Sequence, residues 1–355
     1  MAIGDQTFVY AGLPNRVIFG FGTRARVGDE VRRLGVQRPL LLCTPEQKAQ
    51  ALAAQLGADL AGVFAGATMH TPVAVTEKAL AVVAQTRADG LISFGGGSTT
   101  GLGKAIALRT GLPQIVLPTT YAGSEMTDIL GETSEGRKKT LRSPQVQPEV
   151  AIYDVELTLT LPTGLSATSG MNAIAHAVEG LYAEDRNPIV SLMALEGIRS
   201  LSEGLPVIVK QPQDRAARAQ ALYGAWLCGT VLGSVRMALH HKLCHVLGGS
   251  FDLPHAETHT VILPHATSFN ARAVARELAP VAEILHSAGP GQGLYDLAKR
   301  IGAPLSLQEI GMPAAGLDQA AALATESPYF NPRAASLAEI RALLDDAFHG
   351  RRPEL

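Results

Sequence analysis

The sequence predicts an α/β domain followed by an all-α domain, on the strength of two observations. Up to about Leu161, short apolar runs alternate with segments of helical periodicity, which is typical of a parallel sheet covered by helices on both faces. Beyond that point the strand signals fade, and Ala- and Leu-rich segments with helical spacing dominate. A chain of 355 residues is also too long for one typical core. We therefore expect an α/β domain over 1–160 and a helical domain over 161–355.

The expected strands of the first domain are its most continuous apolar runs, because strands buried on both faces lack polar alternation. These runs are 39–43, 90–94, 114–118 and 150–154. Helical patterns over 45–56 and 72–88 lie between them. In the second half, Pro188, Pro206 and Pro212 are expected near helix starts or stops.

Composition excludes several classes of partner. A formal net charge of −2 offers no electrostatic attraction for nucleic acid. The apolar run between Arg218 and Arg236 is short for a membrane span and contains three glycines, so we interpret it as a buried helix and expect no membrane partner.

The N-terminus does not look like a signal peptide. The three cysteines form no CxxC pair, which indicates a reduced, cytoplasmic protein. A homodimer is the base-rate expectation.

A glycine-rich turn follows the run 90–94 and opens a helix. Gly95, Gly96 and Gly97 allow close approach of a ligand, and the N–H groups of Gly97, Ser98 and the next residue would point at an anion at the helix N-terminus. The turn is neither a GxGxxG fingerprint nor a Walker loop. A tight turn without a ligand is the alternative, but the sequence favours a diphosphate.

A second polar loop follows the run 114–118. Thr119, Thr120 and Ser124 supply hydroxyl groups at the carboxyl end of the sheet, where open α/β sheets bind ligands. Helix capping alone explains this loop equally well. Thr44 follows the run 39–43, where an acidic residue would favour NADH. Because Thr44 is small and neutral, a dinucleotide with or without a 2′-phosphate would be accepted here.

Histidines concentrate in one segment, with five of the ten between 240 and 259. His241 and His245 share a helical face, and so do Asn172 and His176. We expect His255 in a loop that follows paired glycines. Metal binding, proton donation or both would use such a cluster. Three imidazoles can hold zinc, whereas iron(II) usually also takes a carboxylate, and no nearby acidic residue is an obvious ligand.

Four motifs then occur in order: GGGS at 95–98, PTT…GSE at 118–125, the Asn172 helix, and HxxxHxxGG…PH at 241–255. In this the chain resembles the iron-containing alcohol dehydrogenase family, which shares its fold with dehydroquinate synthase. The resemblance implies an N-terminal nucleotide-binding domain, a C-terminal helical domain and an active site in the cleft.

The resemblance also implies roles for individual positions. The positions matching the family's metal ligands are Asn172, His176, His241 and His255. His245 matches a histidine near the nicotinamide. The positions matching the cofactor site are the glycine loop with Ser98, and Thr119, Thr120 and Lys139.

Three departures are shared with one branch of the family, the maleylacetate reductases. Asn172 replaces a ligand Asp, Gly101 replaces another Asp, and the loop 118–125 is one residue short. That branch reduces maleylacetate, a small dicarboxylate, to 3-oxoadipate with NADH or NADPH during aromatic breakdown. It is thought to need no metal, so we expect none here.

The chemistry suggests why Asn172 would be tolerated. Hydride addition to a conjugated alkene gives a delocalised enolate, which preorganised hydrogen-bond donors can stabilise. We expect His241 or His245 to donate to the enolate oxygen. Asn172 would orient His176 or bind the substrate, and as a neutral residue it would not repel a dianion. Candidate carboxylate clamps are Arg236, Lys242 and Lys138.

Three other classes stay open. The runner-up is a metal-dependent alcohol dehydrogenase that acts on small alcohols or aldehydes. The others are a lyase of the dehydroquinate synthase kind, which uses NAD transiently, and a non-enzymatic nucleotide-binding protein. The density of histidines argues against the last.

Overall fold

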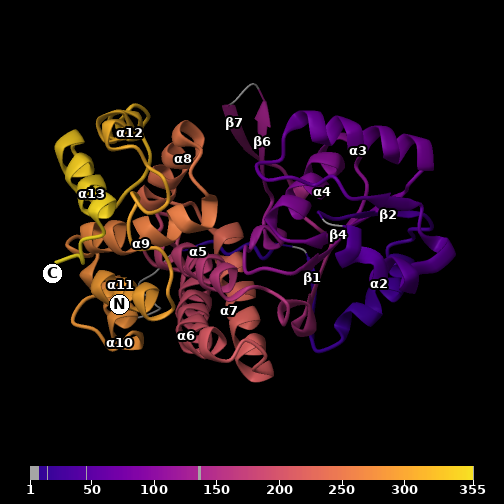
Figure 1. The fold of residues 1–355 in the computed structure, drawn as a ribbon, viewed down its shortest axis with the longest axis horizontal. Coiled ribbons are helices and arrows are strands. Elements are labelled where there is room, and N and C mark those ends of the chain that lie inside the picture. Colours follow the sequence, from indigo (N-terminus) through magenta and orange to yellow (C-terminus); the bar gives the residue numbers. More distant parts are fainter. Residues whose placement is uncertain (1–7, 14, 45, 135–136, 355) are drawn as a thin grey trace. The chain divides into compact units, whose positions relative to one another are not determined.

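The computed structural model describes residues 8–13, 15–44, 46–134 and 137–354. The chain divides into two compact units, of which one is Gly12–Leu161 and the other is Pro162–Leu355 together with residues 8–11. Figure 1 shows the first unit in indigo to magenta and the second in magenta to yellow. The first unit contains a sheet with helices and the second is helical, which confirms the predicted fold class.

All six strands of the main sheet run parallel, in the order β1-β8-β5-β4-β2-β3. Their bounds are β1 (Arg16–Gly20), β2 (Pro39–Leu42), β3 (Gly62–Phe64), β4 (Gly90–Gly95), β5 (Gln114–Pro118) and β8 (Val150–Asp154). The four predicted strands are β2, β4, β5 and β8. The two edge strands, β1 and β3, were not predicted, because their residues are partly exposed and form no continuous apolar run.

The helices of this unit cover both faces of the sheet, as predicted. They are α1 (Val27–Arg33), α2 (Glu46–Leu56), α3 (Val73–Thr86) and α4 (Gly97–Thr110). Alternate residues of a strand point to opposite faces. Leu41 accordingly packs in one core with residues of α1 and α2, whereas Leu40 and Leu42 pack in another core with residues of α3 and α4.

A two-stranded antiparallel hairpin was not predicted. It consists of β6 (Ile129–Ser134) and β7 (Arg137–Arg142), and Glu132 lies opposite Lys139. Strand β6 is mostly half-buried and β7 is mostly polar and exposed at 139–142, so neither forms a continuous apolar run.

The helices of the second unit are α5 (Thr163–Tyr182), α6 (Pro188–Lys210), α7 (Arg215–Ser234), α8 (Leu239–Phe251), α9 (His255–Ala271), α10 (Ala275–Ile284), α11 (Pro290–Arg300), α12 (Leu317–Thr325) and α13 (Leu337–His349). Helix α5 is buried from Ser166 to Tyr182 and packs against α6, α7, α9 and α10, whereas α12 and α13 pack with α8 and α9. Pro188 begins α6 and Pro212 precedes α7, as expected. Pro206 instead lies inside α6, near its C-terminal end.

Glycines allow α6 and α7 to approach closely. A Cβ atom at Gly224 would lie 2.9 Å from the carbonyl oxygen of Gly197. This run of α7 is the one that the sequence predicted as a buried helix. Among the described residues no single helix has the length and apolarity for a membrane span; α7 and α8 pass that test only as a pair, with a bend of 94° between them.

Candidate active site

Two loops of the α/β unit meet at the carboxyl end of the sheet. The backbone N–H of Thr119 donates to the carbonyl of Gly95 at 2.9 Å, which joins the turns after β5 and β4. Gly95 has φ +153°, and a Cβ there would lie 2.3 Å from Oγ1 of Thr99. A Cβ at Gly96 would lie 3.0 Å from the Thr120 side chain. Glycine is therefore required where the two loops touch.

Gly97 and Ser98 are the first two residues of α4. Gly97 is exposed and Ser98 is half-buried, so the positive end of the helix dipole is open to an anion. Gly101, which departs from the family pattern, packs against another segment: a Cβ there would lie 2.4 Å from Oγ1 of Thr71. Close packing against Thr71 therefore explains why residue 101 is a glycine.

The remaining predicted cofactor residues lie in different places. Thr44 is exposed after β2, which pairs with β4. Ser124 begins a short 3-10 helix, and its carbonyl oxygen accepts a hydrogen bond from Lys104. Lys139 is exposed on β7. Thr44, Thr119 and Thr120 thus share one edge of the sheet with the glycine turn, whereas Lys139 belongs to the hairpin.

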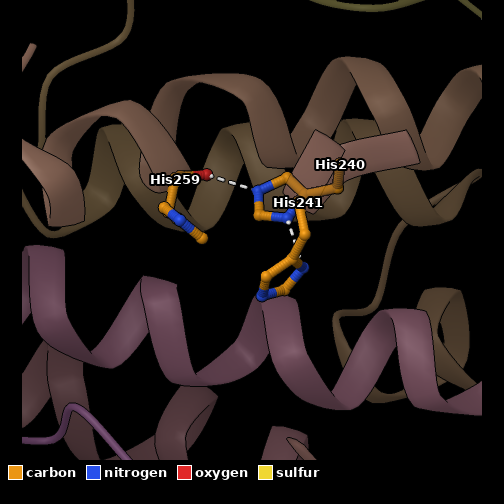
Figure 2. A group of neighbouring side chains, drawn as sticks. All are labelled: His240, His241 and His259. Atoms are coloured by element: carbon orange, nitrogen blue, oxygen red, sulfur yellow. Dashed lines mark hydrogen bonds between the residues drawn. The ribbon is translucent and has the colours of Figure 1, made fainter. Parts of the chain in front are cut away.

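In the helical unit, three helices bring a group of histidines together. His176 comes from α5, His240 and His241 come from α8, and His259 comes from α9. The ring centroid of His241 lies 5.2 Å from that of His176 and 4.9 Å from that of His259. All four histidines are buried. Figure 2 shows the three that α8 and α9 contribute.

A buried carboxylate organises the first turn of α8. Glu179 of α5 lies 2.7 Å from Nδ1 of His241 and accepts the backbone N–H groups of Ala238 at 2.8 Å and His240 at 2.7 Å. The helix dipole favours an anion at this end. Burial raises the pKa of Glu179, and these donors oppose that shift.

These contacts determine which nitrogens carry protons. A carboxylate is a hydrogen-bond acceptor, so Nδ1 of His241 carries the hydrogen and its Nε2 presents a lone pair. The Nε2 atom of His240 donates to the carbonyl of His259 at 3.0 Å, as the dashed line in Figure 2 marks. Burial lowers the pKa values of His176, His241 and His259, which favours neutral rings.

Several buried polar atoms of this cluster have no hydrogen-bond partner among the described residues. They are Oδ1 of Asn172, Nδ1 of His176, Nε2 of His241 and both ring nitrogens of His259. Unpaired buried polar groups are costly and rare in native proteins. The cluster is therefore built to bind something polar.

Two predicted histidines lie at the rim of the cluster. His245 and His255 are exposed, although their rings are near buried ones: the centroids of His241 and His245 are 6.2 Å apart, and those of His255 and His259 are 4.3 Å apart. The expectation of a loop at His255 was wrong, because this residue begins α9 after Pro254, whose fixed φ suits a helix start.

Sequence reasoning missed three residues of this cluster. It did not single out His240 or His259, although the count of five histidines in twenty residues was the available signal. It set aside the acidic residues near the histidines as metal ligands and did not anticipate the contact of Glu179 with His241. The available indication was helical spacing, which places Glu179 on the same face of its helix as Asn172 and His176.

Two of the three proposed carboxylate clamps have contacts with other groups. Arg236 is exposed and lies 3.4 Å from carboxylate oxygens of both Glu184 and Asp185. Lys242 lies over the ring of Tyr329 at 5.8 Å. The side chain of Lys138 falls outside the described residues.

The arrangement of a parallel-sheet unit, a glycine turn at its edge and a histidine-bearing helical unit matches known proteins. Residues 14–155 match the family described as iron-containing alcohol dehydrogenase, and residues 166–348 match the C-terminal part of the same family. The chain belongs to the iron-containing alcohol dehydrogenase family. This confirms the resemblance seen in the motifs and makes the chain an oxidoreductase.

Two curated relatives and one solved structure with high identity to this chain are named maleylacetate reductase. Maleylacetate reductase of Rhizobium sp. (strain MTP-10005) is 59% identical over 351 residues, which are 98% of this chain and 100% of that protein. The maleylacetate reductase of Sphingobium indicum is 53% identical over 98% of this chain and 99% of that protein. The crystal structure of maleylacetate reductase from Agrobacterium tumefaciens is 57% identical, with a TM-score of 0.95 over 98% of this chain and 100% of that chain.

The iron implied by the family name can be tested against the residues present. Ligand atoms of His240, His241 and His259 all lie within 4.8 Å of one another. Iron(II) is usually bound with at least one carboxylate, but Glu179 is fully engaged by hydrogen bonds. A set of neutral imidazoles fits zinc better than iron. The imidazoles of His240, His241 and His259 therefore do not by themselves fit iron.

Proposed function

We propose that this chain reduces maleylacetate (4-oxohex-2-enedioate) to 3-oxoadipate with NADH or NADPH, in the breakdown of aromatic compounds. The similarity to proteins of that name extends over 98% of the chain. The observation that carries the proposal is the composition of the buried cluster: Asn172 and neutral imidazoles supply the atoms that lack partners among the described residues, and the carboxylate of Glu179 is hydrogen-bonded to His241. Because Asn172 is neutral, this site repels a dianionic substrate less than it would with an Asp at that position.

The reaction has two steps. Hydride from the dihydronicotinamide adds to the alkene carbon β to the ketone, and the π electrons move onto the ketone oxygen as an enolate. A proton then adds to the carbon α to the ketone, which lies between the ketone carbon and the carbon that received the hydride. The products are the saturated 3-oxo diacid and the oxidised cofactor. Because the enolate charge is shared between carbon and oxygen, hydrogen-bond donors can stabilise it without a Lewis acid.

The contacts of the cluster support a division of roles among its histidines. Neutral His241 donates from Nδ1 to Glu179, so its Nε2 can only accept. His259 has two ring nitrogens without partners among the described residues, and one of them carries a proton in the neutral ring. We assign the hydrogen bond to the enolate oxygen to His259, with His245 as the alternative donor.

We assign the exposed rim of the cluster, His245 and His255, to the substrate carboxylates. Asn172 binds the substrate or orients His176, since its Oδ1 atom is buried and has no partner among the described residues. These roles need no bound metal, and we propose that the enzyme works without one.

The α/β unit supplies the cofactor site in this proposal. Gly95, Gly96, Gly97 and Ser98 bind the diphosphate. Thr119, Thr120, Ser124 and Lys139 surround the ribose and nicotinamide. Exposed, neutral Thr44 neither binds the adenosine ribose as a carboxylate would nor repels a 2′-phosphate, so NADH and NADPH are both accepted.

One experiment tests the reaction and the absence of a metal. The purified protein is treated with a chelator, its metal content is measured, and oxidation of NADH is followed with maleylacetate. We expect full activity below stoichiometric metal. Activity that vanishes and returns only with iron or zinc would contradict the metal-free mechanism. Absence of NADH oxidation under every condition would contradict the proposed reaction itself.

We further propose a cytoplasmic homodimer. Cys43, Cys228 and Cys244 are buried and form no disulfide with one another, which suits a reducing compartment. Light scattering after gel filtration measures the oligomeric state directly, and a monomer at micromolar concentration would contradict the dimer.

A further inference from the structure

A lysine ammonium is buried in the core of the α/β unit. Lys104 lies in α4 and is 0% exposed. Its Nζ atom donates to the carbonyl oxygens of Ser124 at 2.6 Å, Thr127 at 2.6 Å and Ile129 at 2.9 Å. It also lies 2.8 Å from Oγ1 of Thr127. Four oxygens of one short segment therefore surround a single ammonium group.

The geometry of this cage favours a cation. An ammonium has three N–H donors and no acceptor, whereas a neutral amine would turn its lone pair toward an oxygen. Burial lowers the pKa of Lys104 to about 7, and the buried carboxylate of Glu125 opposes that shift. Glu125 is itself held in place, because it accepts a hydrogen bond from the hydroxyl of Tyr153 at 2.8 Å. Lysine is almost never fully buried unless it is paired in this way.

The cage joins two segments that carry proposed cofactor residues. Helix α4 begins at Gly97 and Ser98, in the proposed diphosphate turn. The segment 124–129 continues the loop that contains Thr119 and Thr120. It has little regular structure, since only Ser124–Met126 form a 3-10 turn before β6 begins at Ile129. The ammonium therefore fixes this segment against the helix that begins at the glycine turn.

We propose that Lys104 is a positioning residue for the cofactor pocket, acting as an internal cation that fixes the segment 124–129 against α4. The cage is a site for a primary ammonium ion, which the protein fills with its own side chain. The proposal rests on the proposed function only in that NADH binds at the glycine turn. It involves no contact between Lys104 and the cofactor.

Direct binding of NADH, measured by fluorescence titration without substrate, tests the proposal. Lys104→Met keeps the length and apolar stem of the side chain but removes the charge. We expect its Kd for NADH to rise about tenfold or more, because charge-assisted hydrogen bonds to the segment are lost. Lys78→Met, at an exposed position of α3, is the matched control and should bind NADH like the unaltered protein.

Chemical rescue separates positioning from simple loss of stability. Lys104→Ala should also bind NADH weakly, and added propylammonium should restore most of the affinity by filling the cage. A rise in Kd that propylammonium does not reverse would overturn the internal-cation proposal. So would a folded Lys104→Met protein, with the circular dichroism and Tm of the unaltered chain, that binds NADH with an unchanged Kd.

Thr127→Val covers the case in which the lysine variants do not fold. It removes one oxygen of the cage, retains the ammonium and preserves the side-chain shape. We expect its Kd for NADH to rise about threefold, and an unchanged Kd would overturn the proposal. Failure of the proposed function is recognised separately, because it would appear as normal NADH binding by the unaltered protein without turnover of maleylacetate.

Discussion

Oε2 of Glu179 lies 2.7 Å from Nδ1 of His241, and this contact joins α5 to α8. The same carboxylate accepts two backbone N–H groups at the start of α8. One side chain therefore caps a helix, selects the protonated nitrogen of His241 and directs the other nitrogen away from itself. Buried partners of this kind fix the orientation and the tautomer of the imidazole that they contact.

Glu179→Gln is expected to lower kcat by about 10- to 100-fold while leaving the Kd for NADH unchanged. The Gln amide has one acceptor oxygen and turns N–H groups toward existing donors, so His241 loses its fixed orientation. Steady-state kinetics and the ¹⁵N chemical shifts of the labelled histidine rings measure the two effects. Glu184→Gln, at an exposed carboxylate, is the control. An unchanged histidine spectrum together with full kcat would show that Glu179 has no positioning role.

Asn172→Asp and Asn172→Ala should behave differently. Asp places a carboxylate beside His176, so the purified protein is expected to retain iron or zinc and to turn over the dianionic substrate more slowly. Ala leaves the metal content low and removes only the amide contacts. Elemental analysis and rates with maleylacetate distinguish the two. Equal metal content in both variants would contradict the view that the Asn keeps the site free of metal.

His259→Phe tests the proposed donor to the enolate. Phe preserves most of the ring volume but has no N–H, and we expect kcat to fall by about 10²- to 10³-fold with little change in the Kd for NADH. His349→Phe, at an exposed ring, should have full activity. If the His259 variant retains kcat, the donor must be assigned to His245 instead.

Protein stability should decrease as the pH falls from 7 to 5. Burial lowers the pKa of five histidines in the folded state, namely His176, His240, His241, His259 and His265. The unfolded chain therefore binds more protons below about pH 6.5, and each histidine removes up to about 1.4 kcal/mol of stability per pH unit. Glu125 and Glu179 act in the opposite direction, because burial raises their pKa values and the folded state binds their protons first.

Urea unfolding at several pH values between 7 and 5 measures this dependence. His265→Gln provides an internal check, because burial lowers the pKa of His265 to about 4. In this variant the slope of the free energy of unfolding against pH should decrease by the equivalent of about one proton. A free energy of unfolding that stays constant over this range would contradict neutral burial of the cluster.

Local sequence patterns were sufficient for most of the α/β unit. The strands β2, β4, β5 and β8 are buried on both faces, so their side chains are apolar at nearly every position and the runs stand out in the sequence. The edge strands β1 and β3 and the exposed hairpin β6–β7 lack that constraint. Their residues tolerate water, and only backbone pairing with other strands reveals them.

The candidate site divides in the same way. Helical spacing alone places Asn172 and His176 on one face and His241 beside His245, because i and i+4 positions are neighbours on any helix. Spacing within one helix says nothing about what another helix brings to it. The packing of α5, α8 and α9 decided that His259 joins the buried cluster, that His255 stays at its rim, and that Glu179 contacts His241. The cage around Lys104 likewise exists only where α4 packs against the segment 124–129. The sequence by itself determined the two kinds of domain and the chemistry available, whereas tertiary packing decided which nitrogen and oxygen atoms are buried together and which of them lack partners.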